Sequence, residues 1–405
     1  MREKISTGID VGSSQVTCVI GHREENEQMP TVVGVGMVEK SGLRRGIVTD
    51  VEETVRSIVA AVQEAERMAG VSTDAAFISV NGQHIHSINN KGVIAIARSH
   101  EEIAPDDVLR AIETAQALSV PPNHEIIHVI PRTFSVDGQE GIKDPVGMTG
   151  TRLEVDAHIV TGSTPFLKNL RRVVEQARVQ VADLVLAPLA ASKAVLTKKQ
   201  KELGVALIDI GAGTTGLVVF EEGDIYHSAI IPIGASDITN DLAIVLKTSL
   251  EVAEKLKLEH GVASPVGLSD RETIDLAKYD KKEEQVVSRR FIAEIIDARL
   301  SEIFNMVRAE LRKINREGKL PAGVVLSGGA AKMPGIIDSA KQHLQLPSQV
   351  GFPLELRGMI DRLDDPRYTT AIGLMLWGMD EDAAKYFSSE ISFGSLISRI
   401  RNLFK

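Results

Sequence analysis

The segments Gly8–Ser14 (GIDVGSS) and Leu207–Thr215 (LIDIGAGTT) are two copies of one pattern, in which an apolar strand leads into Asp, an apolar residue, Gly and small hydroxylated residues. Each copy continues into a second apolar run, Gln15–Ile20 or Gly216–Phe220, so the repeated unit is predicted to be a β-hairpin. A single strand-Asp-x-Gly match arises by chance in many α/β proteins. Two copies, one opening each half of the chain, instead indicate an internal duplication.

The duplicated hairpins carry the chemistry of a phosphate site. We expect their glycines to allow a turn of positive φ, which aims successive backbone N–H groups at one point. Ser and Thr hydroxyls add donors there, and the two aspartates would hold Mg²⁺ through water. The residues predicted to bind in this way are Asp10, Gly12, Ser13 and Ser14 in the first copy and Asp209, Gly211, Gly213, Thr214 and Thr215 in the second, with Asp10 and Asp209 at the metal.

The composition is that of a folded protein with more than one core. With 405 residues, 43% of them apolar, the chain should form two to three domain-sized cores. The net charge of −9, without a basic stripe in the body of the chain, argues against nucleic acid as a partner. The single cysteine, Cys18, cannot form an internal disulfide, which fits the cytoplasm. No signal peptide and no apolar run long enough to span a bilayer are expected.

The order of predicted elements is that of an α/β protein with an insertion. The first hairpin precedes a strand near residues 30–38, a helix at 50–70 and a strand at 75–80, whereas residues 84–159 alternate strands with one helix as a small α+β module would. A long helix is predicted from about 286 to 317. We assign residues 1–83, 162–198 and 366–379 to a first lobe, 84–161 to an inserted α+β subdomain, 199–234 and 318–365 to a second lobe, 235–317 to its outer subdomain, 380–390 to a linker and 391–405 to a terminal helix.

A third motif lies in Ala322–Gly335, where a strand runs into a glycine turn at the start of a helix. Such a turn lets a flat ring approach the backbone closely. The order of the three motifs resembles the actin-like ATPase superfamily. The resemblance implies that residues 10–14 and 209–215 are two phosphate loops and that residues 327–335 form an adenosine loop, with Gly328, Gly329, Ala330 and Met333 as contacts. Glu254 and Lys257 resemble the Glu-x-x-Lys pair that lies beside the ribose, so ATP and Mg²⁺ are the implied ligands.

Within this superfamily the chain most resembles the FtsA family of bacterial cell-division proteins, which lack actin's usual outer subdomain in the first half and carry a small module elsewhere. This resemblance implies an ATP-binding protein that polymerises with copies of itself on the cytoplasmic side of the cell membrane at the division site. It would tether FtsZ filaments there and recruit other division proteins through the inserted subdomain. Arg289 and Arg290 begin the long helix of the outer subdomain, where the FtsZ C-terminal peptide is expected to bind. A solvated charge pair is the alternative interpretation of these two arginines.

The last fourteen residues, 392–405, predict an amphipathic, basic helix. A helix of residues 391–405 would be about 22 Å long, too short to cross a bilayer, so we expect it to lie in the membrane interface. Docking on the protein's own surface is the alternative. Polymerisation would present many such helices at once and strengthen attachment. The residues assigned to membrane binding are Phe393, Leu396, Ile397, Arg399, Ile400, Arg401, Leu403, Phe404 and Lys405.

The resemblance also bears on catalysis. Hydrolysing relatives place a Glu or Gln near the start of the helix before the second hairpin, where this chain has Ala187. We therefore expect weak or no ATP hydrolysis and assign no catalytic residue. Two other functions remain open: a sugar- or acetate-kinase-like phosphotransferase, which would need a carboxylate base, and an adaptor like the type IV pilus protein PilM. His84 and His86 alternate along one strand and could ligate a metal, although core or solvated histidines are the simpler interpretation.

Overall fold

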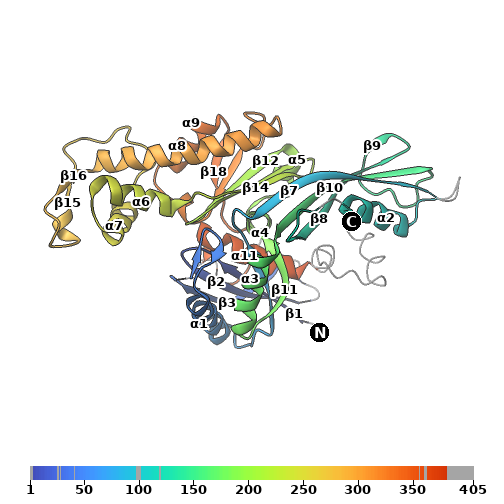
Figure 1. Ribbon diagram of the computed structural model, residues 1–405, viewed down its shortest axis with the longest axis horizontal. Coiled ribbons are helices and arrows are strands. Elements are labelled where there is room, and N and C mark those ends of the chain that lie inside the picture. Colours follow the sequence, from blue (N-terminus) through green and yellow to red (C-terminus); the bar gives the residue numbers. More distant parts are fainter. Residues whose placement is uncertain are drawn as a thin grey trace.

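The computed structural model describes residues 3–24, 27, 29–40, 42–96, 102–117, 120–354, 356–359 and 363–380. The predicted linker beyond residue 380 and the predicted terminal helix, with all nine residues assigned to membrane binding, lie outside this range. The mixed α/β class is confirmed, and three main sheets organise the described part (Figure 1). Within the described residues, no helix is both long and apolar enough to cross a membrane.

The first sheet forms the lower body of Figure 1 and has the order β11-β6-β1-β2-β3. Its strands are β1 (Glu3–Val11), β2 (Val16–Glu24), β3 (Thr31–Val38), β6 (Ala75–Val80) and β11 (Gln180–Leu186). Its helices are α1 (Val51–Ala69), α3 (Thr164–Gln176), α4 (Ala187–Val195) and α11 (Thr369–Met379). The small hairpin of β4 (Leu43–Arg44) and β5 (Ile47–Val48) joins β3 to α1.

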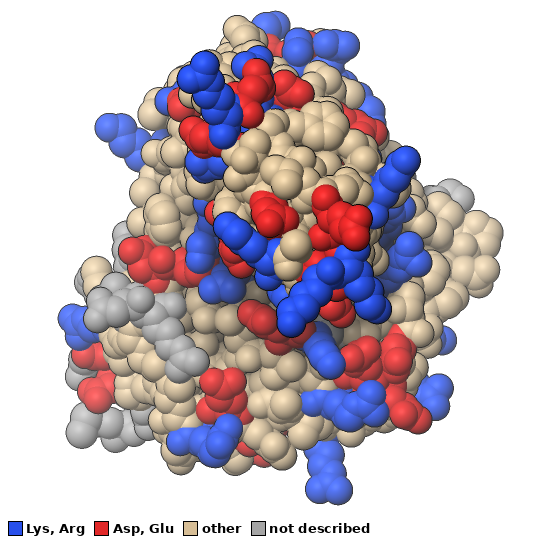
Figure 2. All heavy atoms as spheres, turned by 90° about the vertical axis from the view of Figure 1, so that its left-hand side faces the viewer, with Lys and Arg blue, Asp and Glu red and all other residues tan. Residues whose placement is uncertain are grey.

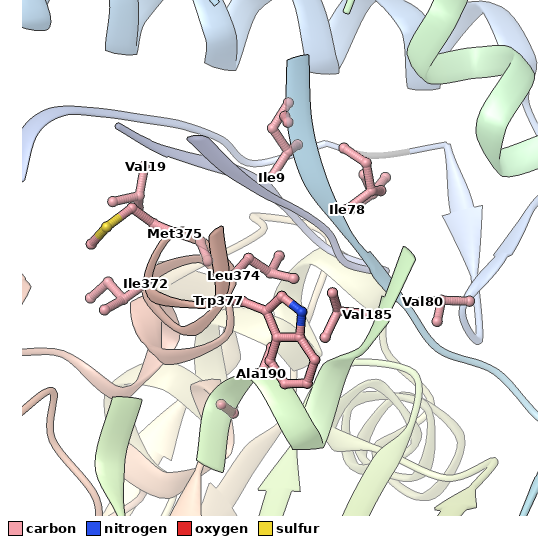
Figure 3. Close-up of a cluster of buried hydrophobic side chains, with 14 of the residues drawn as sticks. Ile9, Val19, Ile78, Val80, Val185, Ala190, Ile372, Leu374, Met375 and Trp377 are labelled. Carbon is pink, nitrogen blue, oxygen red and sulfur yellow. The ribbon is translucent and has the colours of Figure 1, made fainter. Parts of the chain in front are cut away.

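The helix α11 is buried against the first sheet because almost all of its side chains are apolar. Figure 3 shows Leu374, Met375 and Trp377 of this helix gathered with sheet residues such as Val19 and Val185. The backbones approach so closely that a Cβ on Gly8 of β1 would lie 2.4 Å from the carbonyl oxygen of Ala371. Glycine in the strand therefore permits the helix to lie directly on the sheet.

The inserted segment forms its own four-stranded antiparallel sheet, in the order β7-β10-β8-β9. Its elements are β7 (Ile85–Ala95), α2 (Pro105–Gln116), β8 (His124–Val136), β9 (Gln139–Ile142) and β10 (Arg152–Ser163). The helix α2 packs on this sheet over a separate apolar core. It lies so close that a Cβ on Gly92 would come within 2.0 Å of the carbonyl oxygen of Ala111.

The second lobe repeats the plan of the first. Its sheet has the order β14-β13-β12-β17-β18, with strands β12 (Val205–Ile210), β13 (Thr215–Glu221), β14 (Asp224–Ile231), β17 (Val324–Ser327) and β18 (Ser348–Val350). In both lobes the Asp-bearing strand pairs antiparallel with the next strand and parallel with a later one, β6 for β1 and β17 for β12. The duplication predicted from the two hairpins is therefore confirmed at the level of topology.

Helices cover the second sheet, and some of them extend beyond it to the left in Figure 1. They are α5 (Lys198–Leu203), α6 (Ala235–Leu246), α7 (Leu250–His260), α8 (Arg289–Lys313) and α9 (Ile336–Leu344), with 3-10 turns at Leu276–Lys278 and Gly329–Lys332. A further 3-10 turn, Pro366–Tyr368, leads into α11. The long helix α8 begins three residues later than expected. Residues 286–288 form β16 (Val286–Ser288), which pairs with β15 (Thr273–Asp275), and the Ser288 hydroxyl caps the helix by accepting the Phe291 N–H at 3.1 Å.

The inserted sheet contacts the free edge of the second sheet, on the opposite side from α6 and α7 (Figure 1). Ser87 of β7 donates its hydroxyl to the carbonyl of Ser228 in β14, and the Asn89 amide donates to the carbonyl of Tyr226 at 3.1 Å. The buried ring of His158 in β10 lies between these strands, with Nδ1 2.6 Å from Asn89 Oδ1 and Nε2 2.8 Å from Ser228 Oγ. Side chains of the insertion thus satisfy main-chain acceptors at a sheet edge.

Candidate functional site

A pocket of about 810 Å³ lies where the two lobes meet, and both duplicated hairpins line it. Fourteen of the fifteen residues predicted to bind a nucleotide are on its wall. They are Asp10, Gly12, Ser13, Ser14, Asp209, Gly211, Gly213, Thr214, Glu254, Lys257, Gly328, Gly329, Ala330 and Met333. Segments separated by more than three hundred residues in the sequence therefore converge on one cavity.

Asp10 lies one residue before the end of β1 and faces the pocket from the first lobe. The hydroxyl of Ser79, on the parallel neighbour β6, accepts the N–H of Val11 at 3.0 Å and also bonds the Asp10 carboxylate. Burial nevertheless raises the pKa of Asp10 to about 6, since desolvation disfavours the charged form more than this hydrogen bond favours it.

Asp209 occupies the equivalent position at the end of β12 in the second lobe. Burial and the negative charge of Asp10 together raise its pKa to about 7, although the Thr370 hydroxyl donates to it at 3.5 Å. The two carboxylates are therefore close enough to repel each other. A divalent cation between them would relieve that repulsion and replace lost solvation, so the residues present fit a bound Mg²⁺.

The reason for glycine in the two hairpins differs from our expectation. Gly12, Gly211 and Gly213 do not adopt positive φ, so the predicted left-handed turn is wrong at these positions. The space around them is the constraint. A Cβ would lie 3.0 Å from the Gln15 carbonyl at Gly12, 3.3 Å from the Thr214 carbonyl at Gly211, and 2.8 Å from Ser13 Oγ at Gly213.

The third motif, unlike the two hairpins, contains glycines with left-handed backbone, and Gly328 is the one beside Asp209. Gly328 has φ +82, and a Cβ there would lie 2.5 Å from Asp209 Oδ1. Gly329, Ala330 and Met333 follow it along the pocket wall. The expectation that this strand ends in a glycine turn before a helix is confirmed by β17, the 3-10 turn and α9.

Glu254 and Lys257 form an ion pair of 2.7 Å on α7. The Lys257 ammonium also donates to Thr239 Oγ1 at 2.8 Å and to the carbonyl of Ala235 at 3.3 Å. These bonds fix α7 against the first two turns of α6. The pair therefore presents both a carboxylate and an ammonium to the pocket in defined positions.

Thr215 is the predicted contact that does not line the pocket. It is fully buried, and its hydroxyl donates to the carbonyl of Ile233 at 2.8 Å. Thr215 is the first residue of β13, and side chains alternate between the two faces of a strand. The Thr215 side chain therefore points to the Ile233 carbonyl and not into the cavity.

Sequence reasoning missed several pocket residues, most of which come from segments without a recognisable motif. They include Gln15, Glu39, Gly46, Asn81, Ser236, Leu258, Lys332, Arg367 and Thr370. Gln15 is adjacent to a predicted loop, which is a signal that could have been used. Ala187, at the start of α4, also lines the pocket, and its methyl group provides neither a carboxylate nor an amide.

Arg289 and Arg290 lie at the outer end of the second lobe and are not on the pocket wall. Arg289 pairs with Glu272 at 3.4 Å, and Arg290 contacts Glu294 at 3.3 Å and Asp270 at 3.7 Å. Figure 2 views the molecule from this end and shows basic and acidic side chains intermixed. Any acidic ligand at these arginines would have to compete with their own carboxylate partners.

His84 behaves as a core residue. Its ring stacks on Phe166 with 5.0 Å between centroids, and burial lowers its pKa to about 4. Among the residues that the structure describes, no group of three or more His, Cys, Asp or Glu side chains is arranged to hold a metal.

Two lobes built on a duplicated sheet, with an aspartate from each lobe facing the pocket between them, define the actin-like class of proteins. Solved structures agree. The PilM–PilN type IV pilus biogenesis complex matches with a TM-score of 0.68 over 93% of this chain and 98% of that chain, at 15% identity. MreB5 of Spiroplasma citri bound to AMPPNP matches with a TM-score of 0.53 over 93% and 96%, at 14% identity. At such identities these likenesses show the fold alone.

Sequence comparisons identify the family. The family model described as cell division protein FtsA matches residues 206–373, and that described as the SHS2 domain inserted in FtsA matches residues 82–161. The cell division protein FtsA of Pseudomonas aeruginosa is 37% identical over 94% of this chain and 90% of its own length. That of Bacillus subtilis is 39% identical over 92% and 83%, respectively. The chain belongs to the FtsA family and is an actin-like cell-division protein.

Proposed function

We propose that this protein binds ATP with Mg²⁺ in the pocket between its lobes and uses the nucleotide to set the closure of the lobes while it acts in cell division. The observation that carries the proposal is the pocket of about 810 Å³ between the lobes, with one aspartate from each lobe on its wall. The pKa values of these two aspartates are raised to about 6 and about 7. Two like charges that face one cavity are unfavourable unless a cation or proton compensates them.

Each group on the wall has a role that follows from its chemistry. Bound Mg²⁺ would supply positive charge between the carboxylates and the phosphates. Ser13, Ser14 and Thr214 provide hydroxyl donors for phosphate oxygens, and the tightly packed hairpin backbones provide N–H groups. Glu254 and Lys257 suit the hydroxyls of a ribose, and a flat base would lie against the pocket wall that Gly329 and Met333 line.

Turnover is expected to be weak or absent. Relatives that hydrolyse ATP orient water with a carboxylate or amide at the position of Ala187, and a methyl group cannot do so. The nucleotide would then act chiefly as a ligand that favours the closed arrangement of the lobes.

Calorimetric titration of the full chain with ATP tests the site. With Mg²⁺ present we expect binding that Asp209→Asn weakens about tenfold or more, because the cation loses a charged partner. Ser339→Ala, on α9 away from the pocket, is the control and should bind as the parent chain does. If the parent chain gives no heat of binding with ATP, either with or without Mg²⁺, nucleotide binding is refuted. A rapid ATPase rate that Asp209→Asn abolishes would refute the proposal that the nucleotide acts chiefly as a ligand.

We further propose that the protein attaches to the cytoplasmic face of the cell membrane at the division site through residues 391–405 and links FtsZ filaments to it, with other division proteins at the inserted subdomain. Membership of a cell-division family and the basic, amphipathic pattern of these residues support this. Arg289 and Arg290 are candidate contacts for the FtsZ C-terminal peptide.

Liposome co-sedimentation tests the attachment. The full chain should sediment with anionic vesicles, more so under conditions that favour filaments, and a version ending at Glu390 should remain in the supernatant. Equal sedimentation of both versions would contradict attachment through the terminal helix. For FtsZ, charge reversal at Arg290 should weaken binding of the C-terminal peptide without changing ATP binding.

A further inference from the structure

The β4–β5 hairpin of the first lobe reaches the second lobe at the pocket. At its tip, Arg45 places a guanidinium nitrogen 3.0 Å from Asp237 Oδ1 on the first turn of α6. Its backbone also touches the second phosphate loop, since a Cβ on Gly213 would lie 3.0 Å from both Cα and N of Arg45. The hairpin tip is thus in contact with two separate parts of the second lobe.

The same tip is tied to the first phosphate loop of its own lobe. The N–H of Gly46, which lines the pocket, donates to Ser13 Oγ at 3.1 Å. Ser13 Oγ is in turn the nearest atom to a Cβ built on Gly213, at 2.8 Å. Both phosphate loops and the hairpin tip therefore meet at one point, and the lobes cannot separate there without moving the tip from one of its partners.

The hairpin is held more firmly on the first lobe than on the second. Gly46 has φ +76 and packs so tightly that a Cβ would lie 2.7 Å from the N of Gly82. At the base of the hairpin, the carbonyl of Gly42 accepts the N–H groups of Thr49 and Asp50, each at 2.9 Å. Opening of the lobes is therefore expected to break the contact with Asp237 first.

Asp237 is itself held in place for this contact. Its other carboxylate oxygen accepts the Gly234 N–H at 3.0 Å, which completes the N-terminal cap of α6. The Asp237 side chain is 13% exposed and that of Arg45 is 49% exposed, so the pair lies at the edge of solvent. Such a pair is weak enough to open and reclose, and salt should weaken it.

We propose that Arg45 and Asp237 form a latch that holds the two lobes closed and slows the release of a nucleotide from the pocket. This inference rests on the proposed binding of ATP there. Neither residue lines the pocket, so both act on the release of the nucleotide by positioning the lobes. Gly46 adds to the effect by holding the Ser13 hydroxyl in one orientation.

Stopped-flow displacement of an ATP analogue that carries a fluorophore on its ribose tests the latch in the full chain with Mg²⁺. We expect Arg45→Gln and Asp237→Asn each to speed dissociation about 2- to 5-fold, the range for a partly exposed ion pair. The double variant should be no faster than the faster single variant, because both substitutions break one interaction. Arg44→Gln is the matched control, because Arg44 is an exposed arginine at the end of β4 next to the tip, and it should leave the rate unchanged.

Hydrogen exchange of the nucleotide-free chain gives a second measurement. Peptides covering residues 43–48 and 235–246 should exchange faster in Arg45→Gln than in Arg44→Gln. If the parent chain binds no analogue, the proposed function fails, and the exchange result still decides whether the latch exists. If the analogue binds but Arg45→Gln and Arg44→Gln release it at the same rate, the latch is overturned while nucleotide binding stands.

Discussion

At the scale of single residues, the site is determined by close packing around small side chains. Gly213 shows this most clearly, because its neighbours come from the other lobe: Ser13 Oγ at 2.8 Å and the Arg45 backbone at 3.0 Å from a Cβ placed there. The residue type at one loop of the second lobe is thus set by the proximity of the first lobe.

Gly213→Ala should therefore weaken ATP binding more than it weakens the fold. The added methyl must displace the hairpin tip or the Ser13 hydroxyl, and overpacking of this kind costs about 1–3 kcal/mol. Because the displaced groups lie at the contact between the lobes, we expect roughly a tenfold or greater loss of affinity by calorimetry. Urea unfolding serves as the control for stability. Parent-like affinity in a folded Gly213→Ala variant would show that the lobes do not meet here in solution.

At the scale of elements, the contact between the inserted sheet and β14 depends on buried polar groups. His158 and Ser228 are 1% and 3% exposed, respectively, and they hydrogen-bond each other across this boundary. Since a buried polar atom that loses its partner keeps its desolvation penalty, each member of this pair requires the other.

Ser228→Ala should lower the free energy of unfolding by about 1–3 kcal/mol, because it leaves His158 Nε2 without its partner. Ser339→Ala provides a matched control. Ser339 is also 3% exposed, but its hydroxyl has no hydrogen-bond partner in the described structure, so its removal should be neutral or slightly stabilising. Urea denaturation of both variants measures the difference. Equal changes in the two variants would mean that the His158–Ser228 bond contributes nothing.

The same boundary should make the protein sensitive to acid. Burial lowers the pKa of His158 to about 3, so the folded protein keeps this ring neutral while the unfolded chain takes up a proton near pH 6.5. Stability attributable to His158 is therefore complete above pH 6.5 and falls below it, by about 1.4 kcal/mol at one pH unit lower. Unfolding free energies measured at a series of pH values should show a shallower decline in His158→Gln, and an unchanged decline would contradict this assignment.

At the scale of the whole molecule, the lobes are linked by α4 and α11 beneath the pocket and by the insertion on one side. Pro188 of α4 lies 2.9 Å from a Cβ on Gly216 of β13, and Thr369 Oγ1 of α11 lies 2.6 Å from Ser327 Oγ of β17. These contacts leave the pocket side as the place where the lobes can move apart.

A ligand that binds both lobes should stabilise the molecule in a concentration-dependent way. At a hundred times its dissociation constant, ATP with Mg²⁺ should add about 2.7 kcal/mol to the free energy of unfolding. Thermal denaturation with increasing ATP measures this, and omission of Mg²⁺ should reduce the shift in melting temperature. A melting temperature independent of ATP would be inconsistent with a site between the lobes.

The sequence by itself determined the duplicated hairpins, the order of the elements and fourteen of the residues on the pocket wall. The two hairpins repeat one local pattern of buried strand, aspartate and glycine, and the resemblance to the actin-like superfamily supplied Glu254, Lys257 and the adenosine-loop residues. The tertiary structure alone decided which way Thr215 points, why Gly213 is glycine, and that Arg45 meets Asp237. Those facts depend on distances between segments that are remote along the chain, and such distances arise only when both lobes and the insertion pack together.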